Sequence, residues 1–182
     1  MRASGETKFF IGIIVATVAI LVGAVFFFSK PSKEIPVESL IPGDAWATGS
    51  AQPKATLVEF ADFQCPACGA AFPVVKQIVS KYPNDLRYVF RHFPLDQHEN
   101  ARSAAQAAEA AGAQGKFWQM HDLLFANQTN LSQDAINGLG IELSLDMEKF
   151  TKELTDKIYL PKVERDLKDG QSLGVSSTPT FF

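Results

Sequence analysis

The sequence has 182 residues, the length of about one domain, and a formal net charge of -3. Apolar residues make up 46% of the chain and charged residues 20%, which excludes an intrinsically disordered protein and the basic surface of a nucleic-acid-binding protein. Two cysteines are too few for a disulfide-dense scaffold or for a zinc site built on cysteine alone.

An uncharged apolar run of 20 residues occupies residues 9–28. A helix of this length spans about 30 Å, the thickness of the hydrocarbon core of a bilayer. A cleavable signal peptide has a shorter apolar region of about 7–15 residues, and no small-x-small cleavage pattern follows before Lys30. We therefore expect an uncleaved transmembrane signal anchor; a cleaved signal peptide and a buried core helix are the alternatives.

The positive-inside rule gives no clear orientation for this run, because basic residues stand on both sides of it. They are Arg2, Lys8, Lys30 and Lys33. The short flank in front of the run and the large domain behind it favour a cytoplasmic N-terminus, with residues 1–8 as the cytoplasmic flank. The domain is then expected on the periplasmic or extracellular side of a bacterial cell membrane.

Residues 29–53 are rich in turn-forming residues and are expected to link the anchor to a domain at residues 54–182. Trp46 is a candidate to pack on that domain. The prolines and glycines of the segment are Pro31, Pro36, Pro42, Pro53, Gly43 and Gly49.

The first strong element of the domain is Ala55–Asp62, an apolar and β-branched run that predicts a buried strand. Apolar residues at helical spacing then predict a helix over Pro66–Lys81, with Pro73 inside it. Leu86–Phe93 is expected to be a second strand. A strand, a helix and a strand in this order predict a parallel, right-handed βαβ unit.

Helical patterns dominate from Pro94 to about Gly174, and Ser132 is expected to cap one of the helices. Thr178–Phe182 is expected to begin a third strand. The candidate helices are Glu99–Ala113, Lys116–Asn127, Ser132–Leu139, Leu145–Leu154 and Lys157–Leu173.

The strongest functional signal is Cys65-Pro66-Ala67-Cys68, between the first strand and the following helix. A thiolate at a helix N-terminus faces unpaired backbone N–H groups and the positive end of the helix dipole, so its pKa falls. Two intervening residues place both sulfurs on one helical turn, where they can form a strained, reducible disulfide. We expect Cys65 to be exposed and nucleophilic, and Cys68 to be buried and to act as the resolving thiol.

Two other interpretations of the pair are a half zinc site and an inert structural disulfide. Zinc needs four ligands, and the sequence has no second Cys-x-x-Cys and no nearby His-x-x-x-His. The histidines, His92, His98 and His121, are scattered along the chain, and we expect His92 and His121 to be packed structural residues. We therefore expect no metal site.

Four segments together resemble the DsbA-like branch of the thioredoxin superfamily: LVEFADFQCPAC, RHFPL, GKFWQMHDLLF and GVSSTPTFF. The resemblance covers roughly residues 46–182. It implies an α/β thioredoxin fold with an all-helical insert at about residues 95–174. It also implies thiol–disulfide exchange on exported proteins, without an organic cofactor.

The resemblance assigns roles to particular residues. Cys65 and Cys68 match the redox pair, and Thr178-Pro179 matches a loop that lies opposite the cysteines and whose proline is cis. The backbone of Thr178 would pair with an extended substrate segment, beside Pro66 and Ala67 between the cysteines. Glu59 stands where the superfamily often has a buried acid that handles the proton of the resolving cysteine. Strand alternation alone leaves an outward-facing Glu59 open.

The chain departs from the family in two ways. The strongest oxidants carry a histidine that can stabilise the thiolate, whereas this chain has Ala67, so the direction of exchange stays open. The family also continues with a strand and a last helix, which implies that roughly 25–40 residues are missing after Phe182.

The sequence thus predicts a membrane-anchored extracytoplasmic thiol–disulfide oxidoreductase, with disulfide oxidation as the favoured direction. A reductase or isomerase is the nearest alternative, and a holdase with a static disulfide is the alternative from another class. The expected partners are unfolded or partly folded exported proteins with cysteines and a DsbB-like membrane redox protein, with no nucleic acid. The protein is expected to be a monomer.

Overall fold

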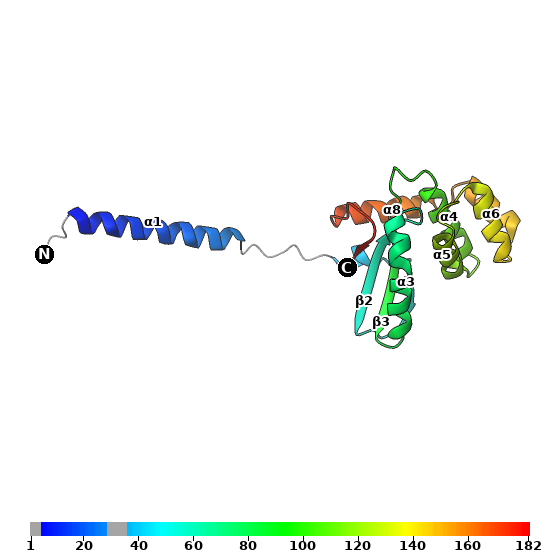
Figure 1. The fold of residues 1–182 in the computed structure, drawn as a ribbon, viewed down its shortest axis with the longest axis horizontal. Coiled ribbons are helices and arrows are strands. Elements are labelled where there is room, and N and C mark those ends of the chain that lie inside the picture. The colour runs from blue at the N-terminus through cyan, green and yellow to red at the C-terminus, as the bar shows by residue number, and fades with distance from the viewer. Residues whose placement is uncertain (1–4, 29–35) are drawn as a thin grey trace. The chain divides into compact units, whose positions relative to one another are not determined.

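The computed structural model describes residues 5–28 and 36–182 (Figure 1). The chain divides into two units, residues 1–35 and residues 36–182. Residues 1–4 of the expected cytoplasmic flank and residues 29–35 of the expected linker lie outside the described residues.

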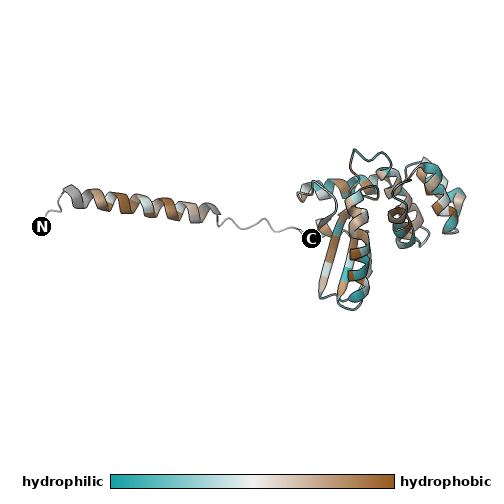
Figure 2. Ribbon diagram, viewed as in Figure 1, coloured by the Kyte–Doolittle hydropathy of each residue, from teal (hydrophilic) through white to brown (hydrophobic). Residues whose placement is uncertain are grey.

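The first unit contains α1 (Gly5–Phe28), a helix of 24 residues that includes the apolar run at residues 9–28. Apolar residues dominate it, as the colouring by hydropathy shows (Figure 2), and the side chains of Phe9, Ile14 and Ile20 are exposed. Yet among the helices of residues 5–28 and 36–182, none combines the length and the apolarity that crossing a membrane requires. The structure therefore contains the expected helix, and its transmembrane character stays a prediction.

The second unit begins at Pro36, so the expected linker at residues 29–53 is wrong for residues 36–53. This segment contains α2 (Val37–Leu40) and β1 (Trp46–Gly49), and β1 pairs antiparallel with a central strand. Trp46 stacks on Phe117 with ring centroids 4.4 Å apart, which confirms that this residue packs on the domain. Proline and glycine made the segment resemble a linker, and a strand of four residues is too short for a periodic signal.

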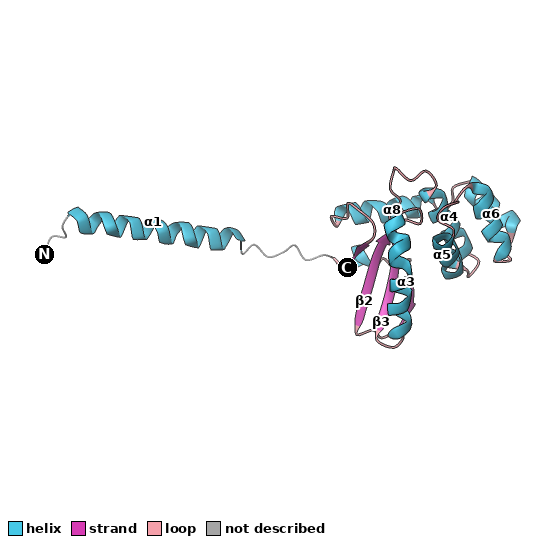
Figure 3. Cartoon of the chain, viewed as in Figure 1, coloured by secondary structure: helices cyan, strands magenta, loops and turns pink. Residues whose placement is uncertain are grey.

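The strands of residues 36–182 form a four-stranded sheet in the order β1-β3-β2-β4 (Figure 3). The central strands β2 (Ala55–Ala61) and β3 (Leu86–His92) are parallel, and α3 (Pro66–Lys81) connects them, so the predicted βαβ unit is confirmed. The short strand β4 (Thr180–Phe181) pairs antiparallel with β2.

Five helices follow β3, as the sequence predicted for the region of residues 95–174. The expected cap is present, because the Ser132 side chain accepts a hydrogen bond from the N–H of Ala135. Alanines with little or no exposed area line the first of these helices, and such small side chains let neighbouring helices approach closely. The helices are α4 (Ala101–Gly112), α5 (Phe117–Ala126), α6 (Gln133–Glu142), α7 (Met147–Thr155) and α8 (Leu160–Ser172).

Each face of the sheet packs in its own apolar cluster. Tyr88 and Phe90 of β3 lie in the cluster that also contains Cys68 of α3 and side chains of the helical insert. Val58 and Phe60 of β2 lie in the other cluster, with Leu167 of α8 and Val89 of β3. Because neighbouring strand residues point to opposite faces, Glu59 shares the first face.

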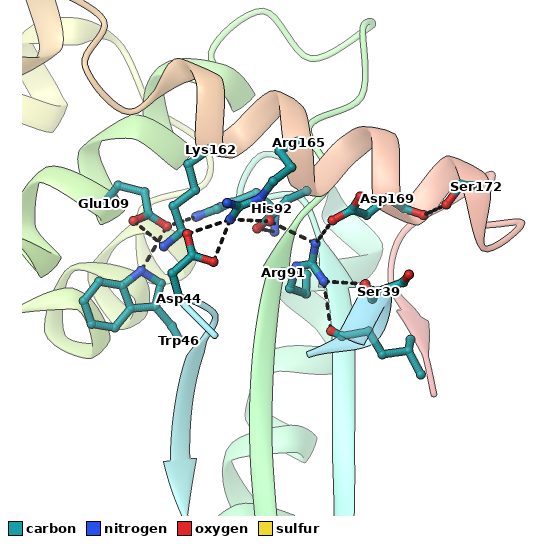
Figure 4. A network of polar contacts seen from close by, with 12 residues as sticks. Ser39, Asp44, Trp46, Arg91, His92, Glu109, Lys162, Arg165, Asp169 and Ser172 are labelled. Carbon is teal, nitrogen blue, oxygen red and sulfur yellow. Dashed lines mark hydrogen bonds and ion pairs between the residues drawn. The ribbon is translucent and has the colours of Figure 1, made fainter. Parts of the chain in front are cut away.

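A polar network ties residues 36–46 to β3 and α8 (Figure 4). The Arg91 side chain is 0% exposed and donates hydrogen bonds to the carbonyls of Ser39 and Leu40, and it forms ion pairs with Asp166 and Asp169. Loss of one partner from such a buried pair costs several kcal/mol, because a buried charge is left uncompensated. The network therefore fixes the N-terminal segment of the second unit to its core.

Candidate active site

The two cysteines stand at the N-terminus of α3. Cys65 is the N-cap residue, Pro66 is the first helical residue, and Cys68 lies in the first turn. Proline is well suited to this position because its missing N–H has no intrahelical partner to lose. The first N–H groups of a helix lack intrahelical partners and carry the positive end of its dipole, so they favour a negative charge on a sulfur next to them.

Both cysteines are free thiols, and both are buried. Cys68 is 0% exposed, and burial raises the pKa of its thiol to about 12, although a hydrogen bond from the N–H of Asp62 to Sγ at 3.5 Å opposes the rise. Cys65 is 7% exposed, so the expectation of an exposed Cys65 is wrong. The Thr178 carbonyl contacts its sulfur, and the Gln128 side chain bonds its carbonyl oxygen.

The peptide bond between Thr178 and Pro179 is cis, as the resemblance implied. The Sγ of Cys65 donates a hydrogen bond to the carbonyl oxygen of Thr178 at 3.5 Å, across 113 positions of sequence. The loop before β4 therefore lies directly against the redox pair. Pairing of Thr178 with an extended substrate, and contacts of Pro66 and Ala67 with it, stay predictions.

Glu59 lies on the face of the sheet that packs against α3 and is 2% exposed. The alternative of an outward-facing, solvent-exposed Glu59 is therefore wrong. Burial raises the pKa of its carboxyl group to about 7, although the Tyr88 hydroxyl, which donates a hydrogen bond to Oε2 at 2.5 Å, opposes the rise. Tyr88 packs in the same cluster as Cys68 and lines a pocket of about 210 Å³, together with Lys76 and Asp122. Glu59 can therefore take up or release a proton near neutral pH.

The sequence analysis missed the polar side chains that hold the loop at residues 62–65, the cysteine loop, in place. The Gln128 Nε2 group donates hydrogen bonds to the carbonyls of Phe63 and Cys65, at 2.7 and 3.0 Å. A Cβ atom at Gly69 would stand 1.9 Å from the Gln128 Oε1 atom, so the glycine makes room for this contact. Asp62 is the second residue that holds this loop, because its carboxylate accepts three hydrogen bonds.

The histidines His92 and His121 are packed structural residues, as expected. His92 Nε2 lies 2.9 Å from Glu109 Oε1, and His121 Nδ1 lies 3.0 Å from Asp122 Oδ1. Burial lowers the pKa of the His121 imidazole below its usual value. Within the part of the chain that the structure describes, no group of three or more His, Cys, Asp or Glu residues is placed to hold a metal ion.

A strand that leads into a helix at a Cys-x-x-Cys pair, with the residue before a cis-proline in contact with the first sulfur, defines the thioredoxin-like class. The family model described as Thioredoxin matches residues 42–182, and the chain belongs to that family.

Solved structures place the chain in the DsbA-like part of this class. A thioredoxin-like oxidoreductase from Silicibacter pomeroyi DSS-3 is 30% identical, with a TM-score of 0.72 over 81% of this chain and 84% of that one. DsbA2 of Pseudomonas aeruginosa is 28% identical, with a TM-score of 0.63 over 78% and 80% of the two chains. The thiol–disulfide exchange protein alpha-DsbA2 of Wolbachia pipientis, at 20% identity and a TM-score of 0.71 over 80% and 79%, supports the fold alone.

The curated relatives are longer proteins. The Na(+)/H(+) antiporter NhaA 1 of Salinispora arenicola is 42% identical over 149 residues, which are 81% of this chain and 22% of the antiporter. The antiporter NhaA of Herminiimonas arsenicoxydans is 40% identical over 127 residues, 70% of this chain and 20% of that protein. The chain spans about a fifth of the length of these relatives.

The family match and the solved structures together identify the chain as a homologue of thioredoxin-like thiol–disulfide oxidoreductases with a DsbA-like fold.

Proposed function

We propose that this protein oxidises pairs of cysteines in unfolded or partly folded exported proteins, on the extracytoplasmic side of a bacterial cell membrane. The observation that carries the proposal is the Cys65–Cys68 pair at the start of α3, with the cis-Pro179 loop against the first sulfur. The resemblance to solved thioredoxin-like oxidoreductases above 25% identity supports the same chemistry.

The proposed reaction begins with a Cys65–Cys68 disulfide. A substrate thiolate attacks Cys65 Sγ, which forms a mixed disulfide and breaks the bond to Cys68, and Cys68 leaves as a thiolate. Because the pKa of Cys68 is raised to about 12, this thiolate takes up a proton, which the carboxyl group of Glu59 can supply. A second substrate thiolate then attacks the substrate sulfur of the mixed disulfide and releases Cys65. The substrate has lost two electrons and the enzyme pair has gained them.

The hydrogen bonds of the free sulfurs support the oxidising direction. In the thiol form, Cys65 donates to Thr178 and Cys68 accepts from Asp62. Contacts that stabilise the reduced pair make its disulfide a stronger oxidant. Ala67 works in the opposite direction, because alanine cannot stabilise the thiolate as a histidine does, and it favours the reductase or isomerase alternative.

The direction is decided by the redox equilibrium of the full chain, purified in detergent, against glutathione buffers. A potential of about -120 mV, typical of a strong disulfide donor, is expected for an oxidase, and a potential of about -250 mV would make the protein a reductant. Cys65→Ser is the matched control. If the protein is a holdase with a static disulfide, the Cys65→Ser variant keeps its ability to bind unfolded proteins. If the protein is an exchange enzyme, the variant loses disulfide exchange.

The location and the partner are part of the same proposal. The uncharged apolar run at residues 9–28 supports attachment to a membrane. Carbonate extraction of cell membranes, with protease added to intact spheroplasts, tests anchoring and sidedness together. A Cys68→Ala variant should trap a DsbB-like partner as a mixed disulfide at Cys65, and the absence of any trapped protein would remove that partner.

A further inference from the structure

Asp62 connects the two cysteines to a second loop of the domain. Its main-chain N–H donates to Cys68 Sγ at 3.5 Å, and its carbonyl accepts a hydrogen bond from the N–H of Cys65 at 3.1 Å. One residue therefore holds the sulfur of the resolving cysteine and the backbone of the attacking cysteine. Any movement of Asp62 changes the environment of both.

The side chain of Asp62 is fully buried and is held by three donors. Oδ1 accepts from the N–H of Gln64 at 2.7 Å, while Oδ2 accepts from the N–H of Leu95 at 2.9 Å and from Nδ1 of His98 at 2.7 Å. A buried carboxylate is costly unless its oxygens are bonded, so these donors keep the residue in place. His98 is the side-chain donor of the three.

His98 lies on the loop between β3 and α4, and its side chain is 18% exposed. A second bond joins the same two segments, because the N–H of Asn100 donates to Oε1 of Gln64 at 2.8 Å. The cysteine loop at residues 62–65 is thus attached to residues 95–100, and the partly exposed imidazole of His98 makes one of these attachments.

We propose that His98 is a positioning residue, which fixes Asp62 and through it the relative reactivity of Cys65 and Cys68. The proposal rests on the exchange function proposed for the same cysteines. His98 touches neither sulfur in the contacts described, so its effect must pass through the Asp62 backbone. The hydrogen bond itself, rather than the bulk of the imidazole, is expected to matter.

Two neutral substitutions test this bond in the full chain. The amide nitrogen of His98→Asn can stand near the position of Nδ1, whereas that of His98→Gln stands nearer to Nε2. The reduced proteins are treated with iodoacetamide, and modification of each cysteine is followed by tandem mass spectrometry. In the wild-type protein Cys65 should react before Cys68, because Cys65 is 7% exposed and Cys68 is 0% exposed. Gln97→Ala, an exposed change on the same loop, is the matched control.

We expect His98→Gln to lower the ratio of the Cys65 and Cys68 rates at least fivefold, and His98→Asn and Gln97→Ala to stay within twofold of the wild-type ratio. The glutathione equilibrium constant should follow the same order, which a change in stability alone would not produce. Equal effects of the Asn and Gln variants, or an unchanged ratio in both, overturn the positioning role. The alkylation needs no disulfide exchange, so a wild-type protein that fails to exchange with glutathione refutes the proposed function separately.

Discussion

Two buried glutamates of this domain behave in opposite ways. Glu59 on β2 is 2% exposed and Glu109 on α4 is 3% exposed, so burial acts on both to a similar degree. The pKa of Glu59 is raised to about 7 by burial, and its one described hydrogen-bond partner, the Tyr88 hydroxyl, is neutral. Burial also acts to raise the pKa of Glu109, but His92 and Lys162 outweigh it and the pKa is lowered.

The difference lies in the partners rather than in the burial. Glu109 accepts hydrogen bonds from Trp46 Nε1 and Lys162 Nζ and lies 2.9 Å from His92 Nε2, so its charge is compensated. A carboxylate with such partners stabilises the fold and stays ionised. Glu59 has no such cation among its described contacts and holds a proton that it can exchange near neutral pH. The hydrogen-bond and ion-pair partners thus make Glu109 a structural acid and leave Glu59 suited to proton transfer.

Loss of the compensated glutamate should have the largest effect on stability. Glu109→Ala leaves His92, Lys162 and Trp46 without their common acceptor, and breaking a buried pair in this way costs about 3–5 kcal/mol. Urea denaturation measures the loss. Glu142→Ala, an exposed change on α6, should stay within about 0.5 kcal/mol of the wild-type protein. A loss below about 1 kcal/mol for Glu109→Ala would show that its partners do not depend on it.

Replacement of Glu59 should instead stabilise the protein at high pH. The folded-state pKa lies above the ordinary glutamate value of 4.5, so the folded state binds more protons and stability falls as pH rises from about 4.5 to about 7. Glu59→Gln removes this loss, which amounts to about 3 kcal/mol above pH 7 and nothing below pH 4. Denaturation of both proteins across this pH range measures the difference, and a difference independent of pH would contradict the raised pKa. The same substitution should slow disulfide exchange.

The sequence pattern could not separate these two glutamates. Alternation placed Glu59 on one face of a strand, but both faces of the sheet are covered, and only the packing of α3 and α8 decides what each face meets. The partners of Glu109 come from positions 46, 92 and 162, and no local pattern links such distant residues. Asp62 and Gln128 were missed for the same reason.

Local motifs were predicted more successfully. The redox pair at the start of a helix depends on neighbours within one turn, and the cis-proline followed from a short local match to a known family. The βαβ unit followed from apolar periodicity. The start of the domain was misplaced because β1 is held by pairing with β3 and by the ring of Trp46, neither of which leaves a periodic trace in residues 36–53.

The packing of Trp46 against α4 gives a third test, because this residue joins the N-terminal segment to Glu109. A Cβ atom at Gly112 would stand 2.3 Å from the Trp46 ring, so Gly112→Ala must displace the ring and should cost about 1–3 kcal/mol. Gly138→Ala on α6 meets nothing within 4 Å and should be neutral or stabilising by up to about 1 kcal/mol. Equal stability of the two variants, measured by urea denaturation, would show that Trp46 is not confined there.

The smallest expected effect is the change in the pKa of Glu59 when the Tyr88 hydroxyl group, its hydrogen-bond donor, is removed. Tyr88→Phe keeps the ring against Trp118 but removes the donor to Glu59, which acts to lower the pKa of that acid. The pKa should therefore rise further, by up to about one unit or about 1 kcal/mol. The midpoint of the pH-dependent stability change that Glu59→Gln abolishes reports this shift, and infrared absorption of the protonated carboxyl group reports it independently. A midpoint that moves down would mean that Tyr88 stabilises the protonated acid instead, so that burial and the Tyr88 hydroxyl would both raise the pKa of Glu59.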